Sequence, residues 1–404
     1  MCIIKNMDKT IGIYVHIPFC VQKCPYCAFN SIGASNVSKD IWDAYSDAVL
    51  KELSFHIEKR PELSDRMLET LYIGGGTPSL MPPEYIKRLV DGIRKTFPFS
   101  SGQPSGQEPE ITIEINPGTI TPLFTHDKLI SFKDAGINRL SIGVQSFHEK
   151  GLKALGRVHS VRDSLRCYEL ARKAGFRNIG IDLIFGIPGQ SLREWEADVD
   201  KALSLRPEHL ATYNLTIEEG TVFSRRYEDG RLFLPSEDEQ TAMYELGIDR
   251  LRSAGYGHYE VSNFSLDGLE CRHNNRYWLA MDYIGLGAGA HSYISAPGWG
   301  VRWWNESPPL TYIRQIRDSG RAAAGMERLT HEEAIAEGLF LGLRKIRGID
   351  LDWFKDRFHT SFKDSHASRF AALEAWDLLY TTDHRLRLTT RGILIADSIT
   401  ASLI

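Results

Sequence analysis

The chain has 404 residues, of which 42% are hydrophobic and 25% are charged, and its formal net charge is −4. At this length a large buried core is expected, and the weakly acidic charge argues against a partner such as nucleic acid held by a basic surface. No stretch approaches the roughly 20 apolar residues that a membrane-spanning helix needs. Met1–Thr10 contains no apolar run of signal-peptide length, so we expect a cytoplasmic protein.

Short β-branched runs alternate with helical patterns over the first half of the chain. The strand candidates are Ile11–Ile17, Met67–Ile73, Glu110–Asn116, Arg139–Ser146, Asn178–Phe185 and His209–Ile217. The helical candidates between them are Ser38–Lys59, Pro83–Phe97, His126–Ala135, Val161–Ala174 and Ser191–Leu205. Six such units in a row predict an α/β fold with a parallel sheet, and the mostly apolar strands are typical of a sheet covered on both faces. The periodicity leaves open whether the sheet closes into a barrel.

Local signals mark helix ends and one loop. Ser191 with Glu194 three residues later predicts a capping box, and Gly136 and Gly175 end their helices with a residue that tolerates a left-handed backbone. Pro98–Pro109 is rich in Pro, Gly, Ser and Gln, which predicts a surface loop.

The pattern changes after Ile217. A helix is predicted over Ser236–Ala254 and a strand over Gly257–Phe264, and from about Glu306 the chain is mainly helical with a short strand near Leu386–Thr389. We therefore divide the chain into residues 1–220, the βα core; 221–305, an extension of that core; and 306–404, a small mainly helical C-terminal domain.

Three of the six cysteines lie within eight residues, in the run Cys20-Val-Gln-Lys-Cys24-Pro-Tyr-Cys27 directly after the first predicted strand. A structural zinc site normally has four protein ligands, and Phe29 stands where a fourth could have followed. A cubane cluster held by three thiolates leaves one iron with an open position that can bind amino and carboxylate groups. The spacing therefore favours a [4Fe-4S] cluster, and a zinc site completed by a distant His or Cys is the alternative.

A glycine run, Gly74-Gly75-Gly76-Thr77-Pro78, follows the second predicted strand. Glycines without side chains let backbone polar groups approach a ligand closely. Because the run also follows the cysteine cluster and lies at a strand end, we interpret it as part of a ligand site; a bare turn is the alternative.

Polar residues stand in or just beyond otherwise apolar strands, where an unpaired polar group is costly. These residues are Glu114, Gln145, Arg157 and Asp182. They predict either ligand contacts or hydrogen bonds inside the sheet.

Together these motifs resemble the radical S-adenosylmethionine superfamily, whose signature is C-x₃-C-x₂-C at the end of the first strand. More closely, Tyr14-Val-His-Ile-Pro-Phe-Cys20 is similar to the oxygen-independent coproporphyrinogen oxidases and the related HemW-type haem chaperones. The resemblance covers about residues 11–295. It implies a partial (β/α)₆ TIM-like barrel with a small mainly helical C-terminal domain.

The resemblance also implies the cofactors. Cys20, Cys24 and Cys27 would hold a [4Fe-4S] cluster that binds S-adenosylmethionine, and one electron from the reduced cluster would break the S–C5′ bond to give a 5′-deoxyadenosyl radical. In relatives, the residues at the matching positions contact the methionine ammonium and carboxylate or the ribose hydroxyls, or pack on the cofactor. In this chain they are Tyr14, Gly74, Gly75, Gly76, Thr77, Glu114, Gln145, Arg157 and Asp182.

Two features separate the oxidases from the chaperones. The oxidases carry a further Cys two residues after the third, where this chain has Phe29, and a long N-terminal extension, where only ten residues precede the first strand here. Both departures argue against porphyrinogen decarboxylation.

The positive signal for a chaperone is the block His273-Asn-Asn-Arg-Tyr277-Trp278, which resembles the H-N-x-x-Y-W motif of the haem chaperones. A neutral imidazole is a good axial haem ligand, and the two aromatic rings offer flat apolar surface. Cys271 or His291 could bind the iron instead, and a purely structural corner is the alternative. The aromatic run Trp299–Trp304 predicts either a porphyrin or partner surface or a buried core.

We therefore expect a haem chaperone that delivers haem to haemoproteins such as respiratory enzymes; the alternative is an oxidase-type enzyme acting on a porphyrinogen-like substrate. Whether the chain is an enzyme stays open. The expected partners are haem, recipient haemoproteins and an electron donor such as a flavodoxin or ferredoxin. The resemblance also allows a peripheral membrane contact and a homodimer.

Overall fold

The computed structural model describes residues 9–34, 37–98, 108–119, 126–360 and 367–403. A twelve-stranded sheet organises it, with the strand order β14-β13-β12-β11-β1-β4-β5-β6-β7-β8-β10-β9. Seven neighbouring strands are parallel. They are β11 (Tyr283–Leu286), β1 (Thr10–Ile17), β4 (Met67–Gly75), β5 (Glu110–Ile115), β6 (Arg139–Gln145), β7 (Ile179–Phe185) and β8 (His209–Asn214).

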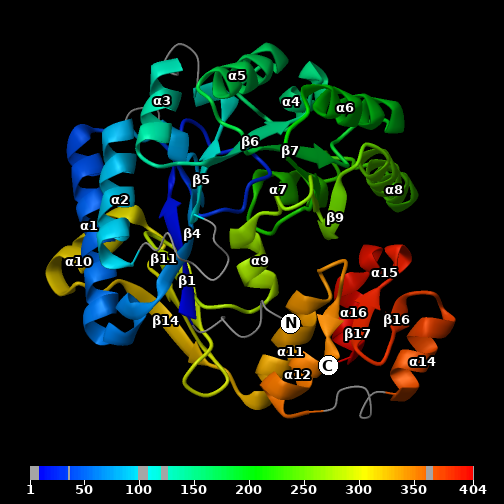
Figure 1. Cartoon of the computed structure of the whole chain (residues 1–404). Helices are drawn as coiled ribbons and strands as arrows, with labels where there is room; N and C mark the ends of the chain where they lie inside the picture. The colour runs from blue at the N-terminus through cyan, green and yellow to red at the C-terminus, as the bar shows by residue number, and fades with distance from the viewer. Residues whose placement is uncertain (1–8, 35–36, 99–107, 120–125, 361–366, 404) are drawn as a thin grey trace.

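The six predicted core strands are confirmed, and β11 joins β1 as a seventh parallel strand from far along the chain. Antiparallel strands extend both edges: β12 (His291–Ile294), β13 (Val301–Asn305) and β14 (Ala323–Arg328) on one side, and β10 (Asn263–Ser265) and β9 (Gly257–Glu260) on the other. The described strands β14 and β9 end the row without pairing to each other, so the curved sheet is a partial barrel (Figure 1).

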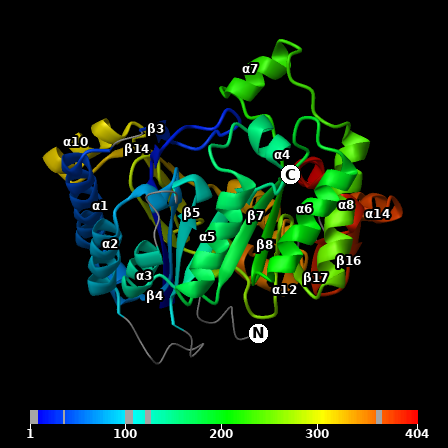
Figure 2. The same cartoon turned by 90° about the horizontal axis from the view of Figure 1, so that it is seen from above.

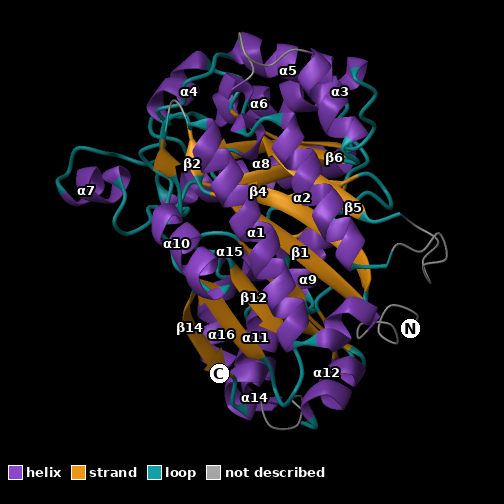
Figure 3. Cartoon of the chain, turned by 90° about the vertical axis from the view of Figure 1, so that its left-hand side faces the viewer, coloured by secondary structure: helices purple, strands orange, loops and turns teal. Residues whose placement is uncertain are grey.

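Helices cover the outer side of the curve, as Figures 1 and 2 show. They are α1 (Lys39–Lys59), α2 (Pro83–Thr96), α3 (His126–Asp134), α4 (Glu149–Ala154), α5 (Val161–Lys173), α6 (Leu192–Leu205) and α8 (Glu237–Ser253). The predicted helices agree with the structure to within two residues at their ends. The capping box of Ser191 and Glu194 is present, and Gly136 and Gly175 have φ of 94° and 84°. Helix α7 (Val222–Glu228) stands out from the body (Figure 3).

The two faces of the parallel strands differ in chemistry. Ile11, Ile13 and Val15 of β1 are fully buried beneath the outer helices. The residues that alternate with them along the strand, such as Tyr14, face the inside of the curve, as does the register partner of Tyr14 on β4, Tyr72. The expectation of two apolar faces is therefore correct for the outer face and wrong for the inner one, which is polar because it lines the site described below.

The chain after Asn305 first completes the large sheet. Helix α10 (Pro309–Ser319) packs against α1, and β14 pairs with β13. A small unit follows, made of α11 (His331–Gly342), α12 (Leu351–Phe358), α14 (Ala367–Ala375), α15 (Thr390–Leu394), α16 (Ala396–Leu403) and the sheet β15-β17-β16 (Ile349–Asp350, Arg385–Leu388, Leu379–Thr381). The predicted strand near Leu386 is confirmed as β17, whereas the domain division at residue 306 stays a prediction.

The structure bears on two further predicted segments. The single strand predicted over Gly257–Phe264 is instead the hairpin β9 and β10, which turns at Val261 and Ser262. Most of the predicted loop Pro98–Pro109 lies outside the described residues. None of the described helices has the length and apolarity needed to span a membrane.

Candidate functional site

A cavity of about 590 Å³ opens at the carboxyl ends of the parallel strands. Most of the residues predicted to bind a cluster and its cofactor line it: Cys20, Cys24, Cys27, Gly75, Gly76, Thr77, Glu114, Gln145, Arg157 and Asp182. They come from β4, β5, β6, β7 and the segments that follow β1 and α4, so the parallel topology brings them to one edge of the sheet. Three predicted residues, Tyr14, Gly74 and His273, do not line this cavity.

The cysteine loop is tied to the glycine run by backbone hydrogen bonds. The Gly76 N–H donates to the Ile17 carbonyl and the Thr77 N–H to the Phe19 carbonyl, both at 2.8 Å. The loop also closes on itself through the short strands β2 (Phe19–Cys20) and β3 (Ile32–Gly33). The first cysteine is therefore held directly against the end of β4.

This close approach explains why glycine occupies position 76. A Cβ there would lie 2.9 Å from the carbonyl oxygens of Ile17 and Phe19 and 3.1 Å from Cys20 Sγ. Gly74 is confined in a similar way, since a Cβ would lie 3.0 Å from Glu114 Oε1. The run thus lets the backbone approach both the cysteines and the neighbouring carboxylate.

The donor set of the loop suits an iron–sulfur cluster. Cys20 is buried, Cys24 and Cys27 are half-buried, and burial raises the pKa of the Cys20 and Cys27 thiols. The Thr77 hydroxyl lies 3.5 Å from Cys20 Sγ. No three His, Cys, Asp or Glu side chains in the described part of the chain converge on a single-ion site. The thiolates of a cubane bind three different iron atoms, so its ligands need not converge on one point.

Arg157 links the cysteine loop to β6. Its Nη1 lies 3.5 Å from Cys24 Sγ, and its Nη2 donates to the Gly143 carbonyl at 3.1 Å. Its buried Nε has no hydrogen-bond partner among the described residues. A planar guanidinium with an unused donor at the cavity wall is suited to a carboxylate ligand.

Two acidic residues face the cavity from neighbouring strands. Glu114 accepts hydrogen bonds from the Tyr72 hydroxyl at 2.9 Å and from the Gly75 N–H at 3.0 Å. Asp182 accepts from the Ser141 hydroxyl with both oxygens at 3.0 Å. Burial raises the pKa of Glu114 to about 7 and that of Asp182 to about 6. Each carboxyl is thus poised to change protonation near neutral pH.

Gln145 ends β6 in a strained conformation. Its φ is 69°, and the pairing of β6 with β7 shifts register between Ile142 and Gln145. A left-handed backbone at a non-glycine residue costs free energy and is frequent at binding sites. The Gln145 side chain lines the cavity.

Tyr14 lies deeper inside the curve of the sheet. Its hydroxyl is 3.0 Å from His16 Nδ1, and its ring stacks at 6.2 Å on Tyr72. It contacts the cavity wall through Tyr72.

His273 lies on α9 (Arg272–Trp278), the helix on the inner side of the sheet (Figure 1). Its ring is 1% exposed, with Nδ1 2.8 Å from the Thr70 hydroxyl and Nε2 2.9 Å from the Tyr277 hydroxyl. Burial, followed by Arg276 and Arg139, lowers the pKa of His273 to about 3. Both ring nitrogens are therefore occupied in a neutral imidazole.

The other predicted haem contacts differ in access. Cys271 is fully buried beside Glu110, whereas His291 is exposed at the start of β12 and stacks at 5.8 Å on Trp304. In the aromatic run, Trp303 belongs to the core, and Trp299 and Trp304 are half-buried.

Sequence reasoning missed several cavity residues. Tyr72 and Ser141 are the hydrogen-bond donors that hold Glu114 and Asp182, and Tyr213 and Asn214 end β8 at the same edge. The signal was present for Tyr72 and Ser141, because each alternates with buried apolar residues of its strand as an inward-facing position does.

Comparison with known proteins identifies two regions. Residues 14–202 match the radical SAM superfamily and residues 329–395 match the HemN C-terminal domain. The chain is 36% identical to the heme chaperone HemW of Bacillus subtilis, over 96% of this chain and 97% of that protein. It is 40% identical to the heme chaperone HemW of Escherichia coli, over 71% of each chain. The solved coproporphyrinogen III oxidase HemN of Escherichia coli superposes with a TM-score of 0.79 at 24% identity, over 98% of this chain and 90% of that one, which shows a shared fold.

Proposed function

This chain belongs to the heme chaperone HemW family within the radical SAM proteins, and from that premise we propose that it binds haem and delivers it to haemoproteins. We propose a [4Fe-4S] cluster on Cys20, Cys24 and Cys27, with S-adenosylmethionine in the cavity beside it. The observation that carries this proposal is that the three cysteines, Gly75 and Gly76 of the glycine run, and both acidic residues line one cavity. When bound, the reduced cluster and S-adenosylmethionine supply one-electron chemistry.

The cavity residues have distinct proposed roles toward the cofactor. The unused donor of Arg157 suits the methionine carboxylate, and the backbone of Gly75 and Gly76, which line the cavity, suits the ammonium group. Glu114 and Asp182 suit the ribose hydroxyls, and the strained Gln145 supplies a further polar contact. Tyr14 supports this wall through Tyr72.

We propose His291 as the iron ligand of haem. For His273 to be that ligand, one of its ring nitrogens must give up its hydrogen bond, and the buried ring must become accessible to haem. His291 is accessible without rearrangement, and partial burial together with Arg302 lowers its pKa, which favours the neutral imidazole that binds iron. Its neighbour Trp304 offers a flat ring for the macrocycle.

A haem titration of anaerobically reconstituted protein, followed by absorption, tests the proposal. We expect a Soret shift that saturates near one haem per chain and that changes in His291→Ala. A wild-type protein with no Soret shift would contradict the chaperone function. An altered spectrum in His273→Ala with an unchanged one in His291→Ala would return the ligand role to His273.

The second candidate function is porphyrinogen oxidation, which the HemN-like fold permits. Phe29, 66% exposed at the cavity edge, stands where the oxidases carry a cysteine. Release of carbon dioxide from coproporphyrinogen III under anaerobic conditions would establish this activity, and we expect none.

Recipient haemoproteins such as respiratory enzymes and a small electron donor such as a flavodoxin or ferredoxin complete the proposal, which places the protein in the cytoplasm. The domain division at residues 220 and 305 belongs to the same proposal. Co-purification under anaerobic conditions with the cluster reduced tests the partner assignments.

A further inference from the structure

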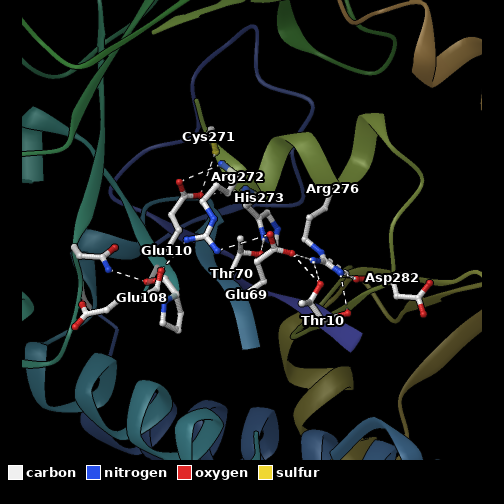
Figure 4. A network of polar contacts seen from close by, with 12 residues as sticks. Thr10, Glu69, Thr70, Glu108, Glu110, Cys271, Arg272, His273, Arg276 and Asp282 are labelled. Carbon is white, nitrogen blue, oxygen red and sulfur yellow. Dashed lines mark hydrogen bonds and ion pairs between the residues drawn. The ribbon is translucent and has the colours of Figure 1, made fainter. Parts of the chain in front are cut away.

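Helix α9 closes the inner side of the sheet at the end opposite the cavity mouth. Glu110 of β5 accepts hydrogen bonds from the N–H groups of Arg272 and His273, both at 3.1 Å (Figure 4). At the other end of the helix the buried Arg276 side chain donates hydrogen bonds to the Glu69 carboxylate and to the Asp282 backbone carbonyl. The helix is thus fixed to β4, β5 and the segment before β11, and its position relative to the strands is set on both sides.

The His273 ring is held in one orientation by this anchoring. The Thr70 hydroxyl of β4 contacts Nδ1 at 2.8 Å, and the Tyr277 hydroxyl contacts Nε2 at 2.9 Å. A buried polar ring with both nitrogens paired has little freedom to rotate, because any other orientation would leave them unsatisfied.

The fixed ring supports a residue of the cofactor cavity. His273 stacks on Tyr72 with centroids 5.2 Å apart and an angle of 26° between the ring planes. The Tyr72 hydroxyl then donates to Glu114 Oε1, whose other oxygen accepts from the Gly75 N–H. Four residues therefore form a continuous path from α9 to the glycine run.

We infer that His273 is a positioning residue for the cofactor pocket: through the Tyr72 ring it places the Glu114 carboxylate where S-adenosylmethionine binds. The inference rests on the proposed assignment of Glu114 to that ligand. It gives the H-N-x-x-Y-W motif a role in S-adenosylmethionine binding beside the cluster, separate from haem ligation.

The test uses the full chain, reconstituted anaerobically, and two readouts: the electron paramagnetic resonance signal of the reduced cluster on titration with S-adenosylmethionine, and haem absorption. We expect His273→Ala to weaken S-adenosylmethionine binding about tenfold, with unchanged iron content and an unchanged haem spectrum. Tyr72→Phe, which removes only the hydroxyl, should have a similar effect. Because both changes interrupt one path, the double variant should lose no more than about tenfold in S-adenosylmethionine affinity relative to wild type. Independent effects would instead multiply to a loss of about a hundredfold.

His273→Phe keeps a flat ring against Tyr72 and should bind S-adenosylmethionine within about threefold of wild type, which a general loss of stability would not allow. His384→Ala, on the exposed surface of the C-terminal part, is the matched histidine control. If His273→Ala fails to fold, Tyr72→Phe and His273→Phe carry the test.

Three results would overturn the inference: wild-type affinity in Tyr72→Phe, multiplicative losses in the double variant, or a His273→Ala protein that loses haem while keeping S-adenosylmethionine. A wild-type cluster signal that ignores S-adenosylmethionine would instead overturn the proposed pocket itself. The wild-type titration therefore separates the two failures.

Discussion

The guanidinium of Arg157 lies 3.5 Å from the Cys24 sulfur while its Nε, buried at the cavity wall, has no hydrogen-bond partner among the described residues. One side chain thus contacts the proposed cluster and keeps a donor for the proposed cofactor. Unpaired buried donors are costly, so an anionic group that accepts from this nitrogen would stabilise the site.

We predict that Arg157→Met retains the cluster but weakens S-adenosylmethionine binding by roughly 10- to 100-fold, the range expected for losing charge-assisted hydrogen bonds worth about 1.5–3 kcal/mol. Titration of the cluster signal measures this change, and iron and sulfide analysis confirms cluster content. Arg157→Lys keeps the charge but not the planar fork, so its affinity for S-adenosylmethionine should lie between those of wild type and Arg157→Met. Equal affinity in wild type and Arg157→Met would show that this residue does not contact the ligand.

Gly76 provides a test of the cluster loop. We predict that Gly76→Ala lowers bound iron and sulfide by more than half, because the added Cβ would lie 2.9 Å from two backbone carbonyls and 3.1 Å from Cys20 Sγ. Backbone atoms cannot move aside as the end of a flexible side chain can.

The control for this substitution is Gly33→Ala in the same loop. There the nearest atom to an added Cβ, the backbone nitrogen of Lys23, is 3.7 Å away, an ordinary contact. It should retain wild-type iron, and equal iron content in the two variants would refute the packing argument.

Much of the site could be predicted because parallel strands end at one edge. The apolar outer residues of β1, β4 and β5 revealed the strands. Glu114 at a strand end and the glycine run at the end of β4 then had to lie near the cysteine loop. The strained backbone of Gln145 could not be predicted, since it arises from a register shift between β6 and β7.

Contacts between side chains that lie far apart in the sequence also could not be predicted from the sequence. Thr70 and His273 are 203 residues apart and meet only because β11 returns the chain to β1. The motif around His273 was recognised, but whether its ring faces solvent or the core depends on that contact. The turn between β9 and β10 escaped prediction because it contains no Gly or Pro; a hydrogen bond between the Asn263 and Glu260 side chains closes it.

The raised pKa values of the acidic pair predict a pH dependence. A protonated Glu114 cannot accept both its internal hydrogen bonds and those of ribose hydroxyls, so the ligand should bind the ionised form. Burial raises the pKa of this carboxyl to about 7. Glu114 is therefore ionised in most molecules at pH 8 and in about one molecule in eleven at pH 6. We predict that S-adenosylmethionine affinity rises about tenfold from pH 6 to pH 8.

Glu114→Gln separates this effect from the titration of the ligand's own amino group. The variant should bind more weakly at pH 8, and whatever pH dependence it keeps belongs to the ligand or to Asp182, whose pKa is about 6. Parallel pH profiles for wild type and Glu114→Gln would contradict the assignment of this titration to Glu114.

A buried carboxylate on α1 anchors the β11–β12 loop that precedes His291. Glu52, 2% exposed, accepts hydrogen bonds from the Asn305 amide and the Tyr312 hydroxyl, both at 2.6 Å, and from the Gly287 N–H at 2.9 Å. Removing the acceptor would leave the buried Gly287 N–H and Tyr312 hydroxyl unpaired, at a cost of about 1–3 kcal/mol each, and would leave the Asn305 amide only its hydrogen bond to the Gly287 carbonyl. We predict that Glu52→Ala lowers the free energy of unfolding by about 3 kcal/mol or more, measured by urea denaturation of the cluster-loaded protein.

The matched control lies on the same helix. Glu58 is exposed, and within the described part of the chain its ion pair is with its neighbour Lys59, so Glu58→Ala should change the free energy of unfolding by about 0.5 kcal/mol or less. Because Gly287 and Asn305 flank the segment that carries His291, the Glu52→Ala protein should also bind haem more weakly, whereas Glu58→Ala should not. A Glu52→Ala protein that unfolds at the same urea concentration as wild type would mean that water reaches and satisfies these donors, and that Glu52 does not fix the loop.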